Sequence, residues 1–444
     1  MLQFIYRMKT SPSSILNRFS KLKISSEWSF LEFQRADTNK LSHGYHRYPA
    51  KFIPQLVDKL VSQYTTEGDL VCDPFGGCGT TLVESKVSGR QSIGFDINPV
   101  AKLITDTKTR AINPKVLEEA KEQFLRKYNQ LQVRPRKVTH NDRIYYWFDK
   151  GVVSKLDILY YSILSIKDGG ARRFFLCAFS HILKNCSRWL MKSIKPTVDK
   201  EKAYSDPKTT FLRHLDSMLK KNKIYYDSLK ESGRLSVPAK MQLWNSTKKL
   251  PLKNRSIDLI VTSPPYVTSY EYADLHQLSL LWFGDDKKNF KKWERFVDNF
   301  LSFKKEFIGS SHKKIVDREF NSKIAEGIVE KLALKDRALS ENVAGYFSDM
   351  RSAFDEMYRI LKPGKKACVI IGNTALQGVP ILNAEVATEQ MLNAGFRRAS
   401  LVKREISNKM ITPWRDTKTG KFTSHSNPSK KRAYQYEYVL LMEK

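Results

Sequence analysis

Short apolar runs alternate with amphipathic segments along most of this chain. Apolar runs of four to six residues, bounded by Gly, Pro and Asp, predict buried strands, and apolar residues spaced three and four apart predict helices that pack on them. Such alternation favours an open, mainly parallel α/β sheet. The expected strands are 68–72, 91–95, 241–245, 258–261, 366–371, 396–403 and 435–442, and the expected helices are 55–64, 80–88, 270–283, 346–361 and 383–393. The last strand alternates apolar and polar residues, which predicts an edge hairpin.

Two stretches interrupt this alternation. Residues 111–240 are helical in pattern, basic and rich in aromatic residues, which predicts a helical domain inserted between strands. Residues 285–340 are polar and charged with little periodicity, so we expect a second insertion or flap. The predicted organisation is a basic N-terminal arm over 1–40, a main domain assembled from 41–110, 241–284 and 341–444, a helical insertion over 111–240, and a polar insertion over 285–340.

The charge balance of the chain indicates a class of binding partner. The 444 residues carry 77 Lys and Arg against 46 Asp and Glu, a formal net charge of +31 that is spread along the chain. Such an excess favours a polyanionic partner, most simply nucleic acid, and the basic helical insertion is the candidate surface for it. A merely solvated basic surface is the alternative reading. No apolar run approaches the length of a membrane span, so we expect no membrane partner.

The metal-binding residue types do not form a convincing set. The five cysteines contain no Cys-x-x-Cys pair, which indicates a reducing compartment without structural zinc. His43 and His46 stand three apart but have no carboxylate or cysteine nearby, so we expect no metal site. Residues 1–26 lack acidic residues, which fits either a basic arm or an organelle transit peptide.

A glycine-rich turn follows the first strand of the predicted sheet. It reads Asp73-Pro-Phe-Gly-Gly-Cys-Gly79 and leads into the helix at 80–88. Glycines at such a turn let the backbone pass close to a ligand that faces the amides of the helix N-terminus. Asp96 ends the next strand, 19 positions after Gly77, where an acidic residue commonly holds a ribose diol. Because the turn matches neither GxGxxG nor a phosphate-binding P-loop, it predicts a nucleoside-type cofactor without a pyrophosphate.

A second candidate site is Thr262-Ser-Pro-Pro-Tyr266, which follows the strand at 258–261. Open α/β sheets carry their chemistry at the carboxyl ends of strands. The two prolines donate no backbone hydrogen bond and hold neighbouring carbonyls rigidly. A hydroxyl, stiff carbonyl acceptors and an aromatic face suit the amino group of a flat base stacked on Tyr266. A plain X-Pro-Pro turn is the alternative reading.

Together these stretches resemble the S-adenosylmethionine-dependent amino-methyltransferases of DNA, the exocyclic-amine class of bacterial restriction-modification systems. The resemblance rests on the aromatic and proline-rich loop 46–54, the turn 73–81 and the pentapeptide 262–266, and it extends more weakly over 340–444. It implies a Rossmann-like class I methyltransferase sheet with a helical insertion, S-adenosyl-L-methionine as cofactor, and no metal.

The resemblance also implies roles for individual residues. Asp96 would hold the ribose, Ile97 would lie beside the adenine, and Asn245 would approach the adenine amino group, where this family more often has an acidic residue. The loop around Tyr48 would close over the methionine part. The cofactor-binding candidates are Tyr48, Pro49, Lys51, Phe52, Asp73, Phe75, Gly77, Gly79, Thr80, Asp96, Ile97 and Asn245, and the catalytic candidates are Ser263, Pro264, Pro265 and Tyr266.

The target base follows from the first residue of the tetrapeptide. In this family serine at that place, here Ser263, is associated with N4 of cytosine, and Asn or Asp with N6 of adenine. We therefore expect methylation of cytosine N4 in double-stranded DNA by base flipping, in the bacterial cytoplasm close to the nucleoid, beside a separately acting restriction endonuclease. The alternatives are an adenine-N6 DNA methyltransferase, an RNA or protein N-methyltransferase with a similar loop, and a non-catalytic nucleic-acid-binding module.

Overall fold

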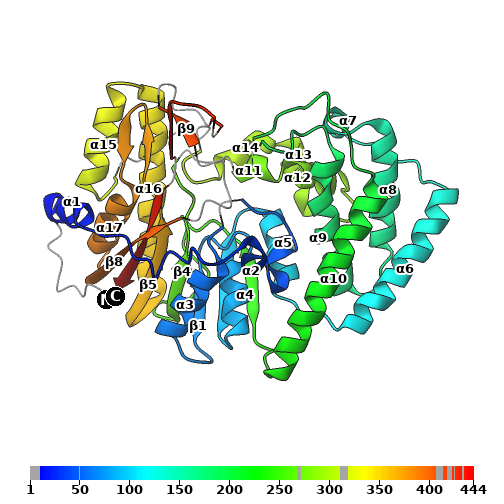
Figure 1. The fold of residues 1–444 in the computed structure, drawn as a ribbon, viewed down its shortest axis with the longest axis horizontal. Helices are drawn as coiled ribbons and strands as arrows, with labels where there is room; N and C mark the ends of the chain where they lie inside the picture. Colours follow the sequence, from blue (N-terminus) through cyan, green and yellow to red (C-terminus); the bar gives the residue numbers. More distant parts are fainter. Residues whose placement is uncertain are drawn as a thin grey trace.

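The computed structural model describes residues 11–444 except 50, 194, 268–271, 311–318, 407–413, 418–422, 425 and 433–434. Within these residues the chain forms two parts that lie side by side (Figure 1). We call residues 114–231 and 277–305 the helical half, which lies on the right of the figure, and the remaining described residues the sheet half. None of the helices in the described ranges is long and apolar enough to cross a membrane.

A seven-stranded sheet forms the centre of the sheet half. In spatial order its strands are β3 (Ala239–Leu243), β2 (Gln91–Asp96), β1 (Leu70–Asp73), β4 (Ile257–Thr262), β5 (Leu361–Ile371), β11 (Tyr436–Glu443) and β8 (Arg398–Glu405). All neighbours pair in parallel except β11, which is antiparallel to both β5 and β8. The predicted Rossmann-like α/β class is confirmed. The strand order reverses between β1 and β4, and ligands bind at such switch points of open sheets.

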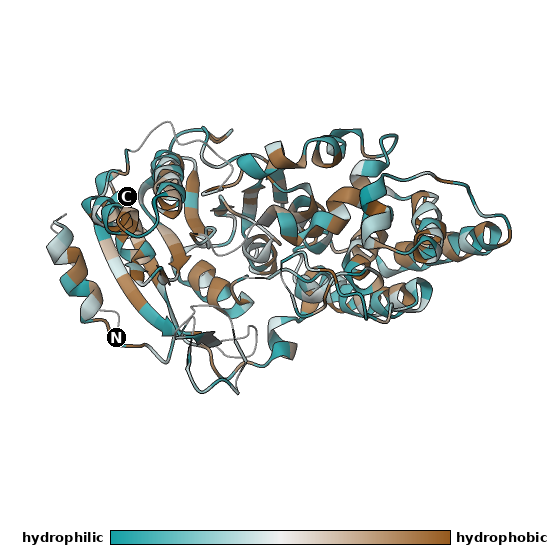
Figure 2. Ribbon diagram, turned by 90° about the horizontal axis from the view of Figure 1, so that it is seen from above, coloured by the Kyte–Doolittle hydropathy of each residue, from teal (hydrophilic) through white to brown (hydrophobic). Residues whose placement is uncertain are grey.

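Helices cover both faces of this sheet. Helix α3 and Trp28 pack on one face, and α16 and α17 pack on the other. In Figure 2 the strands are mostly brown, whereas helices alternate brown and teal, as amphipathic helices do. The helices of this half are α1 (Pro12–Ser20), α2 (Arg35–Thr38), η1 (Leu41–Gly44), α3 (Pro54–Tyr64), α4 (Thr80–Val87), α5 (Pro99–Lys108), α11 (Tyr272–Leu275), α15 (Lys323–Ala333), α16 (Arg337–Ile360) and α17 (Asn383–Asn393), and its two small hairpins are β6 (Thr374–Leu376) with β7 (Val379–Ile381) and β9 (Trp414–Asp416) with β10 (Lys430–Arg432).

The helical half has a core rich in aromatic side chains. Its helices are α6 (Pro114–Val133), α7 (Asp142–Trp147), α8 (Lys150–Leu164), α9 (Gly169–Cys186), α10 (Pro207–Glu231), α12 (Gln277–Asp285), η2 (Lys291–Trp293), α13 (Arg295–Asp298) and α14 (Phe300–Lys305). Trp282 of α12 packs edge-on against Phe179 of α9 at a centroid distance of 5.5 Å. Helix α12 therefore belongs in space to the helical half, although in sequence it follows the Ser-Pro-Pro-Tyr loop. The helix predicted over 270–283 is divided at His276 between α11 and α12, and residues 270–271 lie outside the described ranges.

Residues 285–340, predicted as a second insertion or flap with little periodicity, are helical over much of their described length. Helices α13 and α14 occupy its first part, and α15 contributes buried Ile324, Ile328 and Leu332 to the core beneath α16. These three residues recur every four positions and form one apolar stripe. The many charged residues around that stripe lie on the outer faces and hid its periodicity. Residues 311–318 of the predicted flap lie outside the described ranges.

The N-terminal arm predicted over 1–40 is also different in the structure. From Ser11 onward it packs against the sheet half: α1 buries Ile15 and Phe19, and Trp28 is 3% exposed. Residues 1–10 of the predicted arm lie outside the described residues.

The last strand is not at an edge. It is β11, which lies between β5 and β8. Tyr438 of this strand is covered by Phe19 of α1 at a ring-centroid distance of 5.2 Å. The N-terminal helix therefore supplies the cover that the local pattern could not predict.

Candidate active site

The glycine turn between β1 and α4 is packed too tightly for larger residues. Gly79, the N-cap of α4, has φ +76°, and a Cβ there would lie 2.5 Å from Thr105 Cγ2. A Cβ on Gly76 would lie 2.6 Å from Met241 Cε. The turn thus runs close against α5 and β3, and its inner side remains open to a pocket.

Asp73 joins the glycine turn to the strand that carries the Ser-Pro-Pro-Tyr loop. Its carboxylate accepts hydrogen bonds from Thr262 Oγ1 at 2.6 Å, from Thr81 Oγ1 at 2.8 Å and from the Phe75 N–H at 3.0 Å. Burial raises the pKa of Asp73 to about 6, against the opposite effect of these hydrogen bonds. The backbone immediately before Ser263 is therefore held by the same carboxylate that shapes the turn.

Asp96 lies at the carboxyl end of β2 on the other side of the turn. It accepts the Gly77 N–H at 3.0 Å and the Asn98 N–H at 2.8 Å. Burial raises the pKa of Asp96 to about 6. Because a carboxylate has about four acceptor positions, it can still accept from the two hydroxyls of a ribose.

A single pocket at this edge of the sheet gathers most of the predicted residues. Its empty volume, counted to the open mouth, is about 840 Å³. The predicted residues that line it are Tyr48, Lys51, Phe52, Asp73, Phe75, Gly77, Thr80, Asp96, Ile97, Asn245, Ser263 and Pro265. Those that do not line it are Pro49, Gly79, Pro264 and Tyr266. The pocket thus joins the cofactor turn to the first residue of the tetrapeptide.

Tyr266 is directed toward the far side of the tetrapeptide loop. Its hydroxyl lies 3.4 Å from Glu437 Oε2 on β11, and a Cβ on Gly372 would lie 3.2 Å from its ring. Pro264 is buried beside it. Pro264 and Tyr266 therefore lie on the side of the tetrapeptide loop that faces away from the cofactor pocket.

Lys51 is anchored within its own loop. Its ammonium group donates to the His43 carbonyl at 3.2 Å and to Asn39 Oδ1 at 3.3 Å. Burial lowers the pKa of Lys51 to about 8. Tyr48, on the same loop, packs against His276 at a centroid distance of 5.0 Å, so this wall of the pocket rests on the start of α12.

The imidazoles of the two spaced histidines are engaged in structural contacts. His43 Nε2 lies 2.5 Å from Glu84 Oε1, and His46 Nε2 lies 3.0 Å from Ser180 Oγ. Among the described residues no group of three or more His, Cys, Asp or Glu could hold a metal ion.

Several pocket residues were not among the predicted site residues. Trp244 and Ser246 flank the predicted Asn245, and their place just after a strand could have indicated them. The other wall comes from Glu306, Phe307 and Ile308, which follow α14 inside the predicted polar flap. Asn245 Nδ2 lies 3.4 Å from the Glu306 carbonyl oxygen, which links these two walls.

The residues present fit a nucleoside cofactor that carries a sulfonium. Asp96 offers a carboxylate for the ribose, Phe75 and Ile97 offer apolar flanks for a purine, and the glycine turn offers close backbone approach. No phosphate-binding set accompanies them among the described residues that line the pocket. The fold and this pocket define a class I methyltransferase, for which S-adenosylmethionine is the methyl donor.

Comparison with known proteins identifies the family. A family model described as DNA methylase matches residues 6–106 and 257–444, and the chain belongs to this family. The predicted resemblance to DNA amino-methyltransferases is therefore confirmed. The stretch between the two matched regions contains α6–α10.

Curated relatives match most of the chain. It is similar to the Type II methyltransferase M.MvaI of Kocuria varians, with 26% identity over 93% of this chain and 94% of that protein. It is similar to the Type II methyltransferase M.BsoBI of Geobacillus stearothermophilus, with 23% identity over 82% and 80% of the two chains. M.MjaII of Methanocaldococcus jannaschii is 22% identical over 71% and 79%.

Proposed function

We propose that this protein is the methyltransferase of a type II restriction-modification system and that it methylates cytosine N4 in double-stranded DNA. The observation that carries the proposal is the position of Ser263, which lines the cofactor pocket at the carboxyl end of β4. Its serine is the residue that the resemblance associates with cytosine N4. The names of the relatives support the restriction-modification setting.

The proposed chemistry relies on positioning. The Ser263 hydroxyl and the Pro264 carbonyl accept the two N–H bonds of the cytosine amine and draw its nitrogen out of conjugation with the ring. When bound, the cofactor supplies a methyl group on a positively charged sulfur. Asp73 holds Thr262 at 2.6 Å, which keeps the backbone before Ser263 from moving during the transfer. Orientation and electrostatics then account for most of the rate enhancement, and no covalent enzyme intermediate is required.

A base inside a duplex cannot reach Ser263, so the proposal includes base flipping. Extrusion costs roughly a few kcal/mol, which stacking on Tyr266 and hydrogen bonds at the tetrapeptide loop offset. Tyr266 provides the aromatic face, and its contact with Gly372 keeps the ring close to the loop.

The test is direct identification of the methylated product. The protein is incubated with radiolabelled S-adenosylmethionine and, in parallel, with duplex DNA, RNA and a protein extract, and labelled DNA is digested to nucleosides. We expect N4-methylcytosine from DNA. N6-methyladenine would contradict the base assignment, and label in RNA or protein alone would contradict the substrate class.

We also propose that the helical half contacts the DNA. Helix α10 carries exposed Arg213, Lys220 and Lys223 on its outer face, and a groove beside Asp216 is lined by Arg213, Lys220 and Lys221. Basic side chains of this kind bind phosphates and make affinity salt-dependent. The endonuclease partner would act separately on the same DNA in the cytoplasm, and host DNA carrying this gene should resist the cognate nuclease.

A further inference from the structure

The loop between β3 and β4, residues 244–256, forms one wall of the cofactor pocket. Trp244, Asn245 and Ser246 line the pocket, and they follow an edge strand that has a neighbour on one side only. The Trp244 N–H bonds to the Asp96 carbonyl at 3.0 Å, and the Ser246 hydroxyl donates to the Pro74 carbonyl. These contacts hold the first residues of the loop to the glycine turn, but the rest of the loop needs another support.

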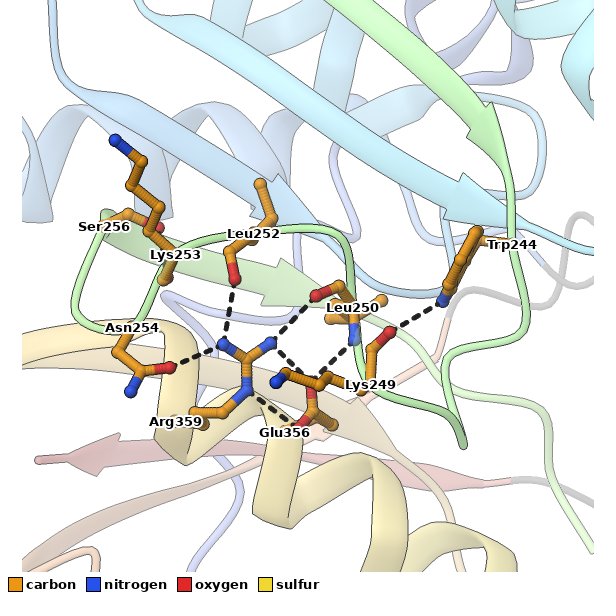
Figure 3. Close-up of polar contacts among 9 residues, drawn as sticks. All are labelled: Trp244, Lys249, Leu250, Leu252, Lys253, Asn254, Ser256, Glu356 and Arg359. Carbon is orange, nitrogen blue, oxygen red and sulfur yellow. Dashed lines mark hydrogen bonds and ion pairs between the residues drawn. The ribbon is translucent and has the colours of Figure 1, made fainter.

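That support is an arginine on α16. All five N–H donors of Arg359 form hydrogen bonds, two to Glu356 and three to the loop (Figure 3). Its loop acceptors are the Leu252 carbonyl at 2.9 Å, Asn254 Oδ1 at 2.7 Å and the Leu250 carbonyl at 2.9 Å. Arg359 thus holds the loop at three residues, Leu250, Leu252 and Asn254.

Glu356, on the same helix, also holds the loop. Its Oε2 accepts the Leu250 N–H at 2.7 Å, so that both polar backbone groups of Leu250 are held by the pair. The side chains of Glu356 and Arg359 are 16% and 19% exposed. Although burial acts to raise the pKa of Glu356, its bonds with Arg359 and Leu250 keep that pKa below its usual value. The carboxylate is therefore charged at neutral pH and pairs with the guanidinium.

A hydrogen bond connects the segment held by Arg359 and Glu356 to the pocket. The indole N–H of Trp244 donates to the Lys249 carbonyl at 3.1 Å, and Lys249 immediately precedes Leu250 (Figure 3). Trp244 is 41% exposed, so packing covers its side chain only in part. Its orientation in the pocket wall therefore depends on where the pair holds Leu250.

We propose that Arg359, together with Glu356, is a positioning residue for the cofactor pocket: it sets the β3–β4 loop so that Trp244, Asn245 and Ser246 complete the wall that binds S-adenosylmethionine. Arg359 acts only through the loop and does not line the pocket itself. The proposal rests on this pocket being the cofactor site and is independent of which base is methylated.

The test compares loop variants in cofactor binding without DNA. We expect Arg359→Gln to weaken the binding of S-adenosylhomocysteine, measured by calorimetry, about 10-fold, and Arg359→Lys about 3-fold, since an ammonium cannot reach all four partners of the planar fork. Asn254→Ala, which removes one exposed acceptor, should weaken it about 2-fold. At saturating cofactor, kcat and the KM for DNA of Arg359→Lys should stay within about two-fold of wild type while the KM for the cofactor rises.

Two further measurements separate positioning from general destabilisation. Arg351→Gln is the matched control, because Arg351 lies on the same helix but pairs with Glu319 and Asp355 instead of the loop. It should leave cofactor affinity unchanged. Acrylamide quenching of the Trp244 signal, isolated by subtracting a Trp244→Phe background, should increase in the Arg359 variants and not in the control.

The proposal is overturned by a folded Arg359→Gln variant with wild-type cofactor affinity, or by equal weakening in Arg351→Gln. If Arg359→Gln does not fold, unchanged affinity in both Arg359→Lys and Asn254→Ala overturns it. Wild-type protein that fails to bind S-adenosylhomocysteine would refute the assignment of the pocket itself. A wild-type protein that binds it but methylates adenine would contradict only the proposed base.

Discussion

The glycine turn of the sheet half and the core of the helical half satisfy buried acidic groups in different ways. In the sheet half, Asp73 accepts hydrogen bonds from neutral hydroxyl and amide groups. In the helical half, His140 lies between two carboxylates, with Nδ1 2.7 Å from Asp285 and Nε2 3.0 Å from Asp157. Although burial favours the neutral imidazole, these two partners raise the pKa of His140 to about 9. The carboxylate at the glycine turn has neutral donors, and the helical half has an ion triad.

The difference matches what each half has to do. Neutral donors around Asp73 and Asp96 fix the shape of the glycine turn. The ion triad lies away from the pocket and connects α12 to residues 140–157 across a long sequence separation. The polar groups around Asp73 therefore shape the glycine turn, and the His140 triad holds segments of the helical half together.

The largest expected effect is a loss of methyl transfer on substitution in the tetrapeptide loop of the sheet half. We expect Ser263→Ala to lower methyl transfer by about 100-fold or more, because it removes one of two acceptors for the amine. Affinity for S-adenosylhomocysteine should stay within about two-fold of wild type, since the glycine turn and Asp96 are untouched. Single-turnover rates and calorimetry measure the two quantities. Wild-type turnover in this variant would remove Ser263 from the chemistry.

The next largest effect should be on the stability of the helical half. Asp157→Ala leaves a buried imidazolium with one partner, and we expect it to lower the free energy of unfolding by about 3 kcal/mol. The matched control is Asp227→Ala on α10, whose solvent-exposed pair with Lys223 should contribute little to the free energy of unfolding. Urea denaturation measures both. Equal destabilisation in the two variants would mean that the triad is no more important than a surface pair.

The pH range over which stability changes should differ between the two halves. A raised histidine pKa stabilises the fold below pH 6.5, and this contribution, about 2 kcal/mol after solvent screening, is lost as pH rises through about 9. The raised carboxyl pKa values of Asp73 and Asp96 act in the same direction, but between about pH 4 and 6.

Thermal unfolding of matched variants tests these windows. The stability difference between wild type and His140→Gln should shrink from pH 6 to pH 10, and that between wild type and Asp73→Asn should change only at acidic pH. A His140→Gln difference that stays constant with pH would show that the imidazole is neutral in the native protein.

The smallest expected effect is a change in DNA affinity on substitution of single basic residues on α10. Lys220→Ala should weaken duplex DNA binding about 3-fold and reduce the slope of log affinity against log salt by about 1, as expected when one fewer phosphate is neutralised. Lys331→Ala on α15, exposed in the sheet half, is the control and should change neither. Filter binding at several salt concentrations measures both slopes. An equal change in the two variants would contradict a DNA surface on the helical half.

Much of the sheet half could be predicted from local pattern. The turn at 73–79, the acidic end of β2 and the loop after β4 each depend on residues close in sequence, whose backbone needs restrict the choice to Gly, Pro and Asp. The errors have two causes. Helix α15 was missed because charged residues surround its apolar stripe, whereas the inner position of β11 depends on pairing with both β5 and β8 and on cover by α1, which lies far away in the chain.

By itself the sequence indicated the candidate chemistry at the carboxyl edge of the sheet, because the glycine turn and the Ser-Pro-Pro-Tyr loop each require particular residues at short spacing. Only the tertiary structure decided which distant segments complete the pocket: Glu306, Phe307 and Ile308 from the second insertion, and Trp244 held through Arg359. The reason is physical. Periodicity reports which face of an element is buried, whereas the identity of the covering partner is set by packing between elements far apart in the chain.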